Sequence, residues 1–229
     1  MDRAIQMLQL QQQLNDATNG ENWEDGVTKN GKKISWQRCI YMEAAEMIDS
    51  FSWKHWKSID KAPDWDNMQI EVVDVWHFVM SLALQEYRKN MLGQLDQLAL
   101  NISQMPSYEA LNNTNVSFAT AEEIYVAVED IMSIALNRKS VDLDALMSKF
   151  FGLVKMSGLD LTTLYRLYVG KNILNQFRQD NGYKEGTYIK EWNGEEDNVV
   201  MKRVWEDNGD LKPEALYREL NKAYSSLNR

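Results

Sequence analysis

The sequence has little cysteine, proline or histidine, with one, three and two of them in 229 residues, and it has no long hydrophobic run. Its single cysteine, Cys39, cannot form an internal disulfide, which favours a reducing compartment. The first residues, 1–3, lack a basic segment followed by an apolar run, and no stretch reaches the ~18 apolar residues of a membrane span. We therefore expect a cytoplasmic protein without a membrane partner.

Positive charge is also scarce. The sequence has 34 acidic and 25 basic residues, which gives a formal net charge of −9. Nucleic acid and anionic membranes repel such a protein, so neither is expected as its main partner. The composition is otherwise ordinary, with 44% hydrophobic and 26% charged residues. This balance excludes collagen-like, low-complexity and disordered chains, and the length allows one large domain or two modest ones.

The scarcity of proline leaves long intervals in which a helix is not interrupted. Helical patterns are predicted over residues 1–16, 34–52, 68–100, 121–136, 142–151 and 159–177, and a terminal helix is predicted to begin at Pro213. Thr120, followed by two glutamates, is typical of a helix N-cap. Residues 51–65 are rich in tryptophan, and residues 180–198 form a predicted loop rich in Gly, Asn and Lys. Since no repeat or alternating strand pattern is present, we predict an all-α helical bundle.

Two pairs of acids stand three residues apart, Glu43 with Glu46 and Glu71 with Asp74, so each pair projects from one helical face. The second pair lies in a segment that is apolar almost all round. A buried carboxylate without compensation costs several kcal/mol, so it becomes protonated, pairs with a cation or binds a metal. The neighbouring sequence offers no lysine or arginine to pair with Glu71 and Asp74.

Four oxygen ligands without a cysteine cluster suit Mg²⁺, or Mn²⁺, better than zinc, and Mg²⁺ on a carboxylate platform usually serves phosphate chemistry. The alternative is that the first pair forms a solvated face and the second marks a helix start. Asp74 and His77 match half of a di-iron motif, but His55 lacks the required acid partner. We therefore predict a magnesium site, with His77 as a hydrogen-bonding residue that lines the pocket.

Basic residues gather in the C-terminal part of this acidic chain. Three polar side chains recur there at spacings of four and three residues, on one face of a helix, and a loop with glycines and further cations follows. These residues are Lys171, Asn175 and Arg178 on the helix, and Tyr183, Lys184 and Lys190 in the loop. A flexible cationic loop is suited to close over phosphates. The alternative is a helix surface with ordinary solvated charges.

The first helix carries an amide-rich face. Its residues Gln12 and Asn15 can read the edge of a nucleobase, because each amide offers paired donors and acceptors. The same residues also fit an ordinary polar helix surface.

Three segments together resemble one known family: EAAE at 43–46, EVVDVWHF at 71–78 and GKNILNQFRQDNGYKEGTY at 170–188. They are similar to the dimeric all-α dUTPases of the type found in trypanosomatids and Campylobacter, over most of the chain. The resemblance implies a homodimer that hydrolyses dUTP, and also dUDP, to dUMP. It further implies a helical core, residues 1–85 and 155–229, and a more mobile helical part, residues 86–154.

The resemblance also implies a role for each site residue. The four acids bind the metal, and Glu43 or Glu46 also polarises the attacking water. Phosphates are held by Lys171, Arg178, Tyr183, Lys184 and Lys190, and uracil lies near Gln12, Asn15, Asn172 and Asn175. Phe78 lies beside the sugar and disfavours a 2′-hydroxyl, while Trp53 or Trp56 contacts the nucleoside.

Two alternatives to this function stay open at the level of sequence. The carboxylate pattern alone is shared with MazG-type pyrophosphatases, so a MazG-type or dCTP-directed pyrophosphohydrolase would keep the chemistry and change the base. A non-catalytic helical interaction protein, whose acids are merely solvated, is the alternative from another functional class.

Overall fold

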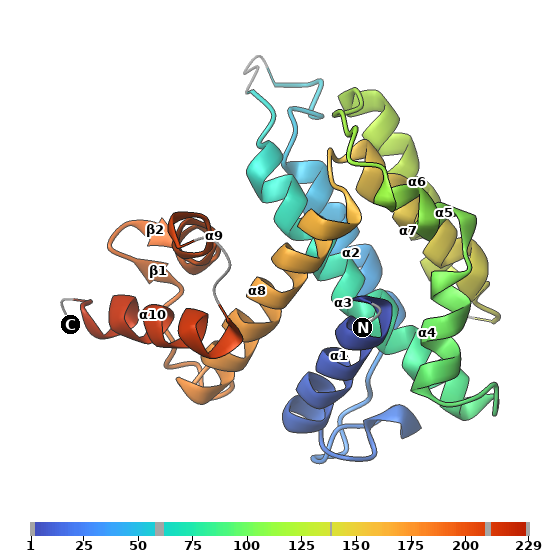
Figure 1. Ribbon diagram of the computed structural model, residues 1–229, viewed down its shortest axis with the longest axis horizontal. Helices are drawn as coiled ribbons and strands as arrows, with labels where there is room; N and C mark the ends of the chain where they lie inside the picture. Colours follow the sequence, from blue (N-terminus) through green and yellow to red (C-terminus); the bar gives the residue numbers. More distant parts are fainter. Residues whose placement is uncertain (1–2, 58–61, 138, 209–211, 228–229) are drawn as a thin grey trace. The chain divides into compact units, whose positions relative to one another are not determined.

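The computed structural model describes residues 3–57, 62–137, 139–208 and 212–227. The predicted all-α class is confirmed, because β1 (Glu191–Trp192) and β2 (Glu195–Glu196), a two-residue antiparallel pair, are the only strands among these residues (Figure 1). The chain divides into two compact units, Met1–Tyr165 and Arg166–Arg229. Among the described residues, no helix combines the length and the apolar character needed to cross a membrane.

The first unit is organised around one long helix, α3. Its helices are α1 (Arg3–Asn19), α2 (Trp36–Asp49), α3 (Trp65–Lys89), α4 (Leu95–Ser103), α5 (Pro106–Glu109), α6 (Ala121–Leu136), α7 (Leu143–Met156) and the start of α8 (Leu161–Asp180), with 3₁₀ turns η1 (Trp23–Asp25) and η2 (Ala110–Asn112). Helices α1, α2 and α7 pack against α3 (Figure 1). Apolar side chains all round α3 are buried, as the sequence predicts. This position explains why its few polar residues need partners.

Helix α3 ends earlier than the sequence predicts. The expected helix to residue 100 is wrong, because α3 ends at Lys89 and α4 begins at Leu95. In the segment between these two helices, Met91 has a positive φ of 53° and Gly93 a positive φ of 138°. Glycine adopts such a φ without steric cost, so Gly93 allows the backbone reversal that the apolar pattern on either side obscures.

Capping side chains mark where several helices begin. Thr120 and Glu123 form a reciprocal capping box at the start of α6, which confirms the predicted N-cap. The Glu123 backbone N–H donates to the Thr120 hydroxyl at 3.3 Å, and the Thr120 backbone N–H donates to the Glu123 carboxylate at 2.9 Å. Hydrogen bonds from Thr120 lower the pKa of Glu123. Helices α2, α3 and α7 are capped by Ser35, Asp64 and Asp142.

The second unit contains the rest of α8, the β1–β2 hairpin, α9 (Asp197–Asp207) and α10 (Pro213–Ser225). Pro213 occupies the first turn of α10, as predicted. The predicted loop 180–198 contains the hairpin and the start of α9, a helix that the sequence pattern did not reveal. The aromatic core of this unit surrounds Phe177, whose ring contacts those of Tyr188, Trp192, Tyr217 and Tyr224.

The division expected from the family resemblance, a core of 1–85 and 155–229 with a mobile part 86–154, concerns motion. It stays a prediction.

Candidate functional site

Three of the four predicted metal ligands lie together in the first unit. Glu43 and Glu46 on α2 and Glu71 on α3 each offer a carboxylate oxygen, and these atoms all lie within 4.8 Å of one another. Glu71 is buried, Glu43 is half-buried and Glu46 is exposed, so the three-acid group opens to solvent on one side. Asp74 lies one turn beyond Glu71 on α3, half-buried and outside this group.

The donor chemistry of the three-acid group fits a hard divalent cation. Mg²⁺ binds oxygen ligands at ~2.0–2.1 Å in an octahedron, so opposite ligands lie about 4 Å apart. Carboxylate oxygens within 4.8 Å of one another therefore need only small side-chain rotations to share one ion. Without a cation, three like charges at this separation repel one another. Glu43, Glu46 and Glu71 would hold the metal, with Asp74 adjacent on α3.

A buried polar network joins α1 to α3. Its members are Gln11, Asn15, His77 and Ser81, each no more than 3% exposed. The Asn15 amide donates to the Ser81 hydroxyl at 2.9 Å, and the Gln11 amide donates to the same hydroxyl and to the Asn15 carbonyl oxygen, both at 3.1 Å. His77 Nδ1 lies 2.6 Å from Gln11 Oε1. His77 therefore forms the hydrogen bond that the sequence predicts, and its place in a substrate pocket stays a prediction.

Two members of this network were missed in the sequence. Gln11 precedes Asn15 by four residues, and Ser81 follows His77 by four, so each shares a helical face with a residue that was singled out. The signal that could have identified Ser81 is a serine in an otherwise apolar helix.

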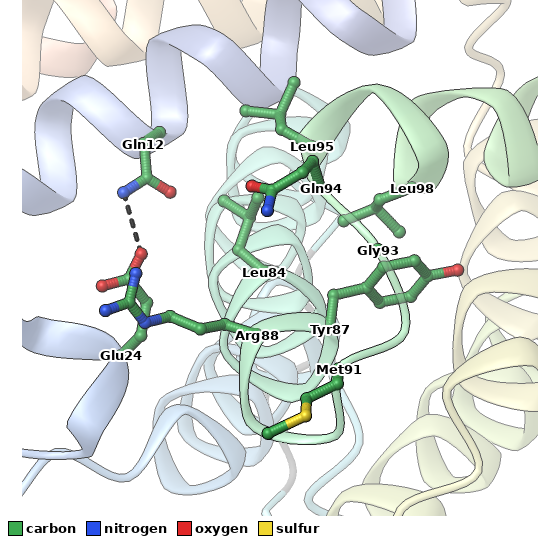
Figure 2. A pocket seen from close by; sticks show the side chains of 10 residues that line it. All are labelled: Gln12, Glu24, Leu84, Tyr87, Arg88, Met91, Gly93, Gln94, Leu95 and Leu98. Atoms are coloured by element: carbon green, nitrogen blue, oxygen red, sulfur yellow. Dashed lines mark hydrogen bonds between the residues drawn. The ribbon is translucent and has the colours of Figure 1, made fainter.

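The other predicted base-reading amide, Gln12, has different partners. It donates to Asp16 and to Glu24, both at 3.1 Å. Figure 2 shows Gln12 at a pocket of about 510 Å³, which is lined by Gln12, Glu24, Leu84, Tyr87, Arg88, Met91, Gly93, Gln94, Leu95 and Leu98. Gln12 and Asn15, expected at one base, therefore lie in different surroundings.

Aromatic residues predicted to contact the nucleoside fall into two groups. Phe78 is half-buried and stacks on Trp36, with ring centroids 6.0 Å apart and an interplanar angle of 26°. Trp53 and Trp56 are 39% and 61% exposed and meet edge to face at 5.4 Å. The Trp53 indole donates to Asp49 at 2.7 Å. Large exposed indoles of this kind are suited to stack on a planar base or sugar face.

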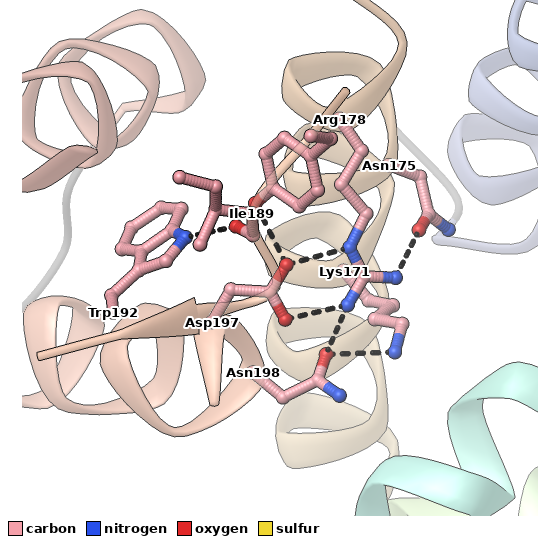
Figure 3. Close-up of polar contacts among 8 residues, drawn as sticks. Lys171, Asn175, Arg178, Ile189, Trp192, Asp197 and Asn198 are labelled. Carbon is pink, nitrogen blue, oxygen red and sulfur yellow. Dashed lines mark hydrogen bonds and ion pairs between the residues drawn. The ribbon is translucent and has the colours of Figure 1, made fainter. Parts of the chain in front are cut away.

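In the second unit, Lys171 and Arg178 are held by residues at the start of α9 (Figure 3). Arg178 donates from Nε and Nη2 to the Asp197 carboxylate at 2.8 and 2.7 Å, and Lys171 donates to Asn198 Oδ1 at 2.8 Å. The Tyr188 hydroxyl also donates to Asp197, at 2.7 Å. Burial and the neighbouring Asp197 raise the pKa of Tyr188. Arg178 therefore pairs with a buried acid from a segment that the sequence pattern predicts to be a loop.

The remaining predicted residues of α8 and its loop differ in burial. Asn175 accepts from Arg178 Nη1 at 3.3 Å, and Asn172 is buried and donates to Tyr168 at 3.3 Å. The Arg178 guanidinium lies 5.9 Å from the centroid of the Tyr183 ring. Tyr183 is exposed, and so are the two loop lysines, Lys184 and Lys190.

A comparison with protein families decides the assignment. The family model described as dUTPase matches residues 4–183. The chain belongs to the dUTPase family. The match includes both acid pairs, the α1–α3 network and the cations of α8, and it ends before Asp197 and Asn198. No match was found among curated proteins.

Membership in the dUTPase family makes the protein an enzyme, a dUTP diphosphatase whose substrate is a nucleotide. Enzymes of this family generally use a divalent metal, and the three-acid group is suited to hold one. The alternative of a non-catalytic helical interaction protein is thereby excluded.

Proposed function

We propose that this dUTPase is a Mg²⁺-dependent enzyme that converts dUTP, and also dUDP, to dUMP, keeps uracil out of DNA and supplies dUMP. We further propose that it works in the cytoplasm as a homodimer of the trypanosomatid and Campylobacter type. The observation that carries the metal dependence is the convergence of Glu43, Glu46 and Glu71 within 4.8 Å. Mg²⁺ is preferred because the donors are all carboxylate oxygens, and Mn²⁺ would fit the same set.

In this proposal the acids have two roles. Glu43, Glu46, Glu71 and Asp74 hold the metal, which when bound neutralises phosphate charge and makes bound water more acidic. Glu43 or Glu46 accepts the proton of the attacking water. The exposed Glu46 and half-buried Glu43 support this role, because water must reach the base, whereas Glu71 lies deeper.

We propose substrate contacts for two sets of side chains. Phosphates are held by Lys171, Arg178, Tyr183, Lys184 and Lys190. The nucleoside is contacted by Gln12, Asn15, Trp53 or Trp56, His77, Phe78, Asn172 and Asn175. The support is chemical: Arg and Lys are the usual donors to phosphate oxygens, amides match a base edge, and indoles stack on planar rings.

A product assay on metal-free enzyme tests the proposal. Mg²⁺ and Mn²⁺ are added separately. Release of pyrophosphate and of the corresponding monophosphate is measured with dUTP, dATP, dCTP, dGTP and dTTP, and release of phosphate is measured with dUDP. We expect Mg²⁺-dependent turnover of dUTP and dUDP with little turnover of the other nucleotides. Full activity in the presence of a strong chelator would contradict the metal role, and equal turnover of dCTP would favour a broader pyrophosphohydrolase.

A matched pair of variants connects the activity to the site. Glu71→Gln removes one charge from the three-acid group, whereas Glu129→Gln removes one charge from the exposed face of α6. Loss of turnover in the first variant only supports the site, and equal turnover in both contradicts it. Sedimentation analysis over a concentration range tests the homodimer, which a concentration-independent monomer mass would overturn.

A further inference from the structure

In the α1–α3 network, the hydroxyl of Ser81 determines which group donates and which accepts in each hydrogen bond. Its hydroxyl is fully buried and lies 2.8 Å from the backbone carbonyl of His77 and 3.4 Å from Asn15 Oδ1. A hydroxyl has one proton, and a carbonyl can only accept, so the shorter contact takes the Ser81 proton. The Ser81 oxygen is then an acceptor toward its other neighbours.

This assignment of donors and acceptors fixes the orientation of two side-chain amides. Asn15 must turn its NH₂ group toward Ser81, at 2.9 Å, and Gln11 must do the same at 3.1 Å. Gln11 Oε1 is thereby turned to His77, 2.6 Å from Nδ1, and Nδ1 must carry the proton that is shared in this contact. One serine proton therefore determines the rotation of both amides and the tautomer of the histidine.

The orientation of Asn15 matters because uracil and cytosine differ by a donor–acceptor exchange. Uracil presents an N3–H donor beside carbonyl acceptors, whereas cytosine presents an N3 acceptor beside an amino donor. An amide that rotates freely matches either base, and an amide held in one rotation matches only one of them. Within the described part of the chain, the bonds to Ser81 and Gln11 use one N–H and one lone pair of Asn15, so one of each remains for a base.

We infer that Ser81 is a positioning residue, which holds Asn15 in one amide rotation and thereby gives the enzyme its preference for uracil over cytosine. This inference rests on the proposed role of Asn15 at the base. Ser81 acts through Asn15. Its removal therefore changes the preference for dUTP over dCTP more than it changes the turnover of dUTP. Because a mismatched polar pair leaves buried groups without partners, the change in selectivity is expected to be about tenfold.

Kinetics with two nucleotides test the inference. We expect Ser81→Ala to lower the dUTP/dCTP ratio of kcat/KM about tenfold, mainly through faster turnover of dCTP, in a protein that is still folded by circular dichroism. The matched control is Ser157→Ala, because Ser157 is equally buried and its hydroxyl also donates to the carbonyl four residues earlier, that of Leu153, at 2.7 Å. A ratio that is unchanged in Ser81→Ala would overturn the inference.

The Asn15→Ala variant separates this inference from the proposed function. If Asn15→Ala loses selectivity and Ser81→Ala keeps it, Asn15 reads the base and the positioning role of Ser81 is wrong. If Asn15→Ala keeps the parent ratio, the proposed contact of Asn15 with the base is itself wrong, and the inference fails with it.

Nitrogen-15 NMR of the imidazole groups provides a readout that does not depend on activity. The chain has two histidines, and His55→Gln assigns the remaining resonances to His77. In slightly alkaline buffer we expect His77 of the parent to carry its proton on Nδ1, and Ser81→Ala to give a mixture of tautomers. A proton on Nε2 in the parent would overturn the inference, even if the Ser81 variant fails to fold.

Discussion

Asp197 binds Arg178 through two parallel hydrogen bonds, from Nε at 2.8 Å and from Nη2 at 2.7 Å (Figure 3). The side chain of Asp197 is fully buried and that of Arg178 is 8% exposed. Tyr188 adds a third bond to the same carboxylate. Asp197 is also the first residue of α9, where the helix dipole favours a negative charge. The guanidinium of Arg178 is therefore held in a defined plane by a residue nineteen positions further along the chain.

We predict that Asp197→Asn destabilises the protein by about 3–5 kcal/mol, because it removes the charge of a buried carboxylate that holds the guanidinium through two hydrogen bonds. Urea unfolding followed by circular dichroism measures this loss. Glu195→Gln is the matched control, since Glu195 binds Arg203 through both carboxylate oxygens but the two side chains are 43% and 49% exposed. That change should cost less than about 1 kcal/mol. Equal losses of unfolding free energy in the two variants would show that burial does not make the Asp197–Arg178 pair more important than the exposed pair.

The kinetic role of Arg178 can be tested separately from its structural role. Arg178→Ala should raise KM and lower kcat for dUTP, and Arg178→Lys should restore little of the loss, because an ammonium cannot reproduce the planar fork. Initial rates are compared with those of Asp197→Asn, which keeps the guanidinium. Arg178→Lys kinetics equal to those of the parent would show that the guanidinium makes no specific contact with phosphate.

Removing one charge from the three-acid group should lower activity without lowering stability. We predict that Glu71→Gln and Asp74→Asn each reduce turnover by orders of magnitude, because they weaken the hold on the metal. In metal-free buffer the melting temperature of Glu71→Gln should equal or exceed that of the parent, since Glu43 and Glu46 then meet one like charge fewer. Mg²⁺ should raise the melting temperature of the parent and raise that of the variant less. Normal turnover in both variants would show that these acids do not bind the metal.

The parts of this structure that the sequence predicts are those with a local signal. The three-residue spacing within each acid pair indicates a shared helical face, and α2 and α3 bring Glu43, Glu46 and Glu71 together. Thr120 and Pro213 mark helix starts through side-chain chemistry that acts within one turn. Such signals depend only on residues a few positions apart, so they can be read without the tertiary structure.

The parts that escaped prediction depend on contacts between distant segments. Asp197 pairs with Arg178 because α9 packs beside α8, and a loop prediction for 180–198 contains no information on that packing. Ser81 and Gln11 meet across α1 and α3 for the same reason. The end of α3 was missed for a different reason, since the reversal at Gly93 is local but lies between two apolar patterns that together fit one helix.

The capping box gives a pH-dependent prediction. Hydrogen bonds from the Thr120 backbone and hydroxyl lower the pKa of Glu123 in the folded state. The resulting stabilisation is fully present above the unfolded-state pKa, about 4.3, and is lost as the pH falls through the lower folded-state value. We therefore expect Thr120→Ala to be less stable than the parent at neutral pH and the difference to shrink in acid. Unfolding at several pH values measures it, and a difference that grows on acidification would contradict the assignment.

The last prediction concerns the choice between deoxyribose and ribose, which the family resemblance assigns to Phe78. The ring of Phe78 is held by stacking on Trp36, and the residue lies one turn beyond Asp74 on α3. A ring fixed beside the sugar would leave a ribose 2′-hydroxyl desolvated and without a partner, at a cost of roughly 1–3 kcal/mol. Phe78→Ala should therefore lower the dUTP/UTP ratio of kcat/KM by about 5- to 150-fold.

A second aromatic distinguishes this role from simple packing. Phe150 is fully buried and stacks on Trp76 at 4.8 Å, so Phe150→Leu removes a ring from the hydrophobic core. That variant should lose stability by a few kcal/mol and keep the dUTP/UTP ratio, because only its hydrophobic packing is reduced. Phe78→Leu should lose less stability, since Phe78 is only half-buried, and should still lower the ratio. If both variants keep the parent ratio while remaining folded, Phe78 is a packing residue and the sugar is selected by another group.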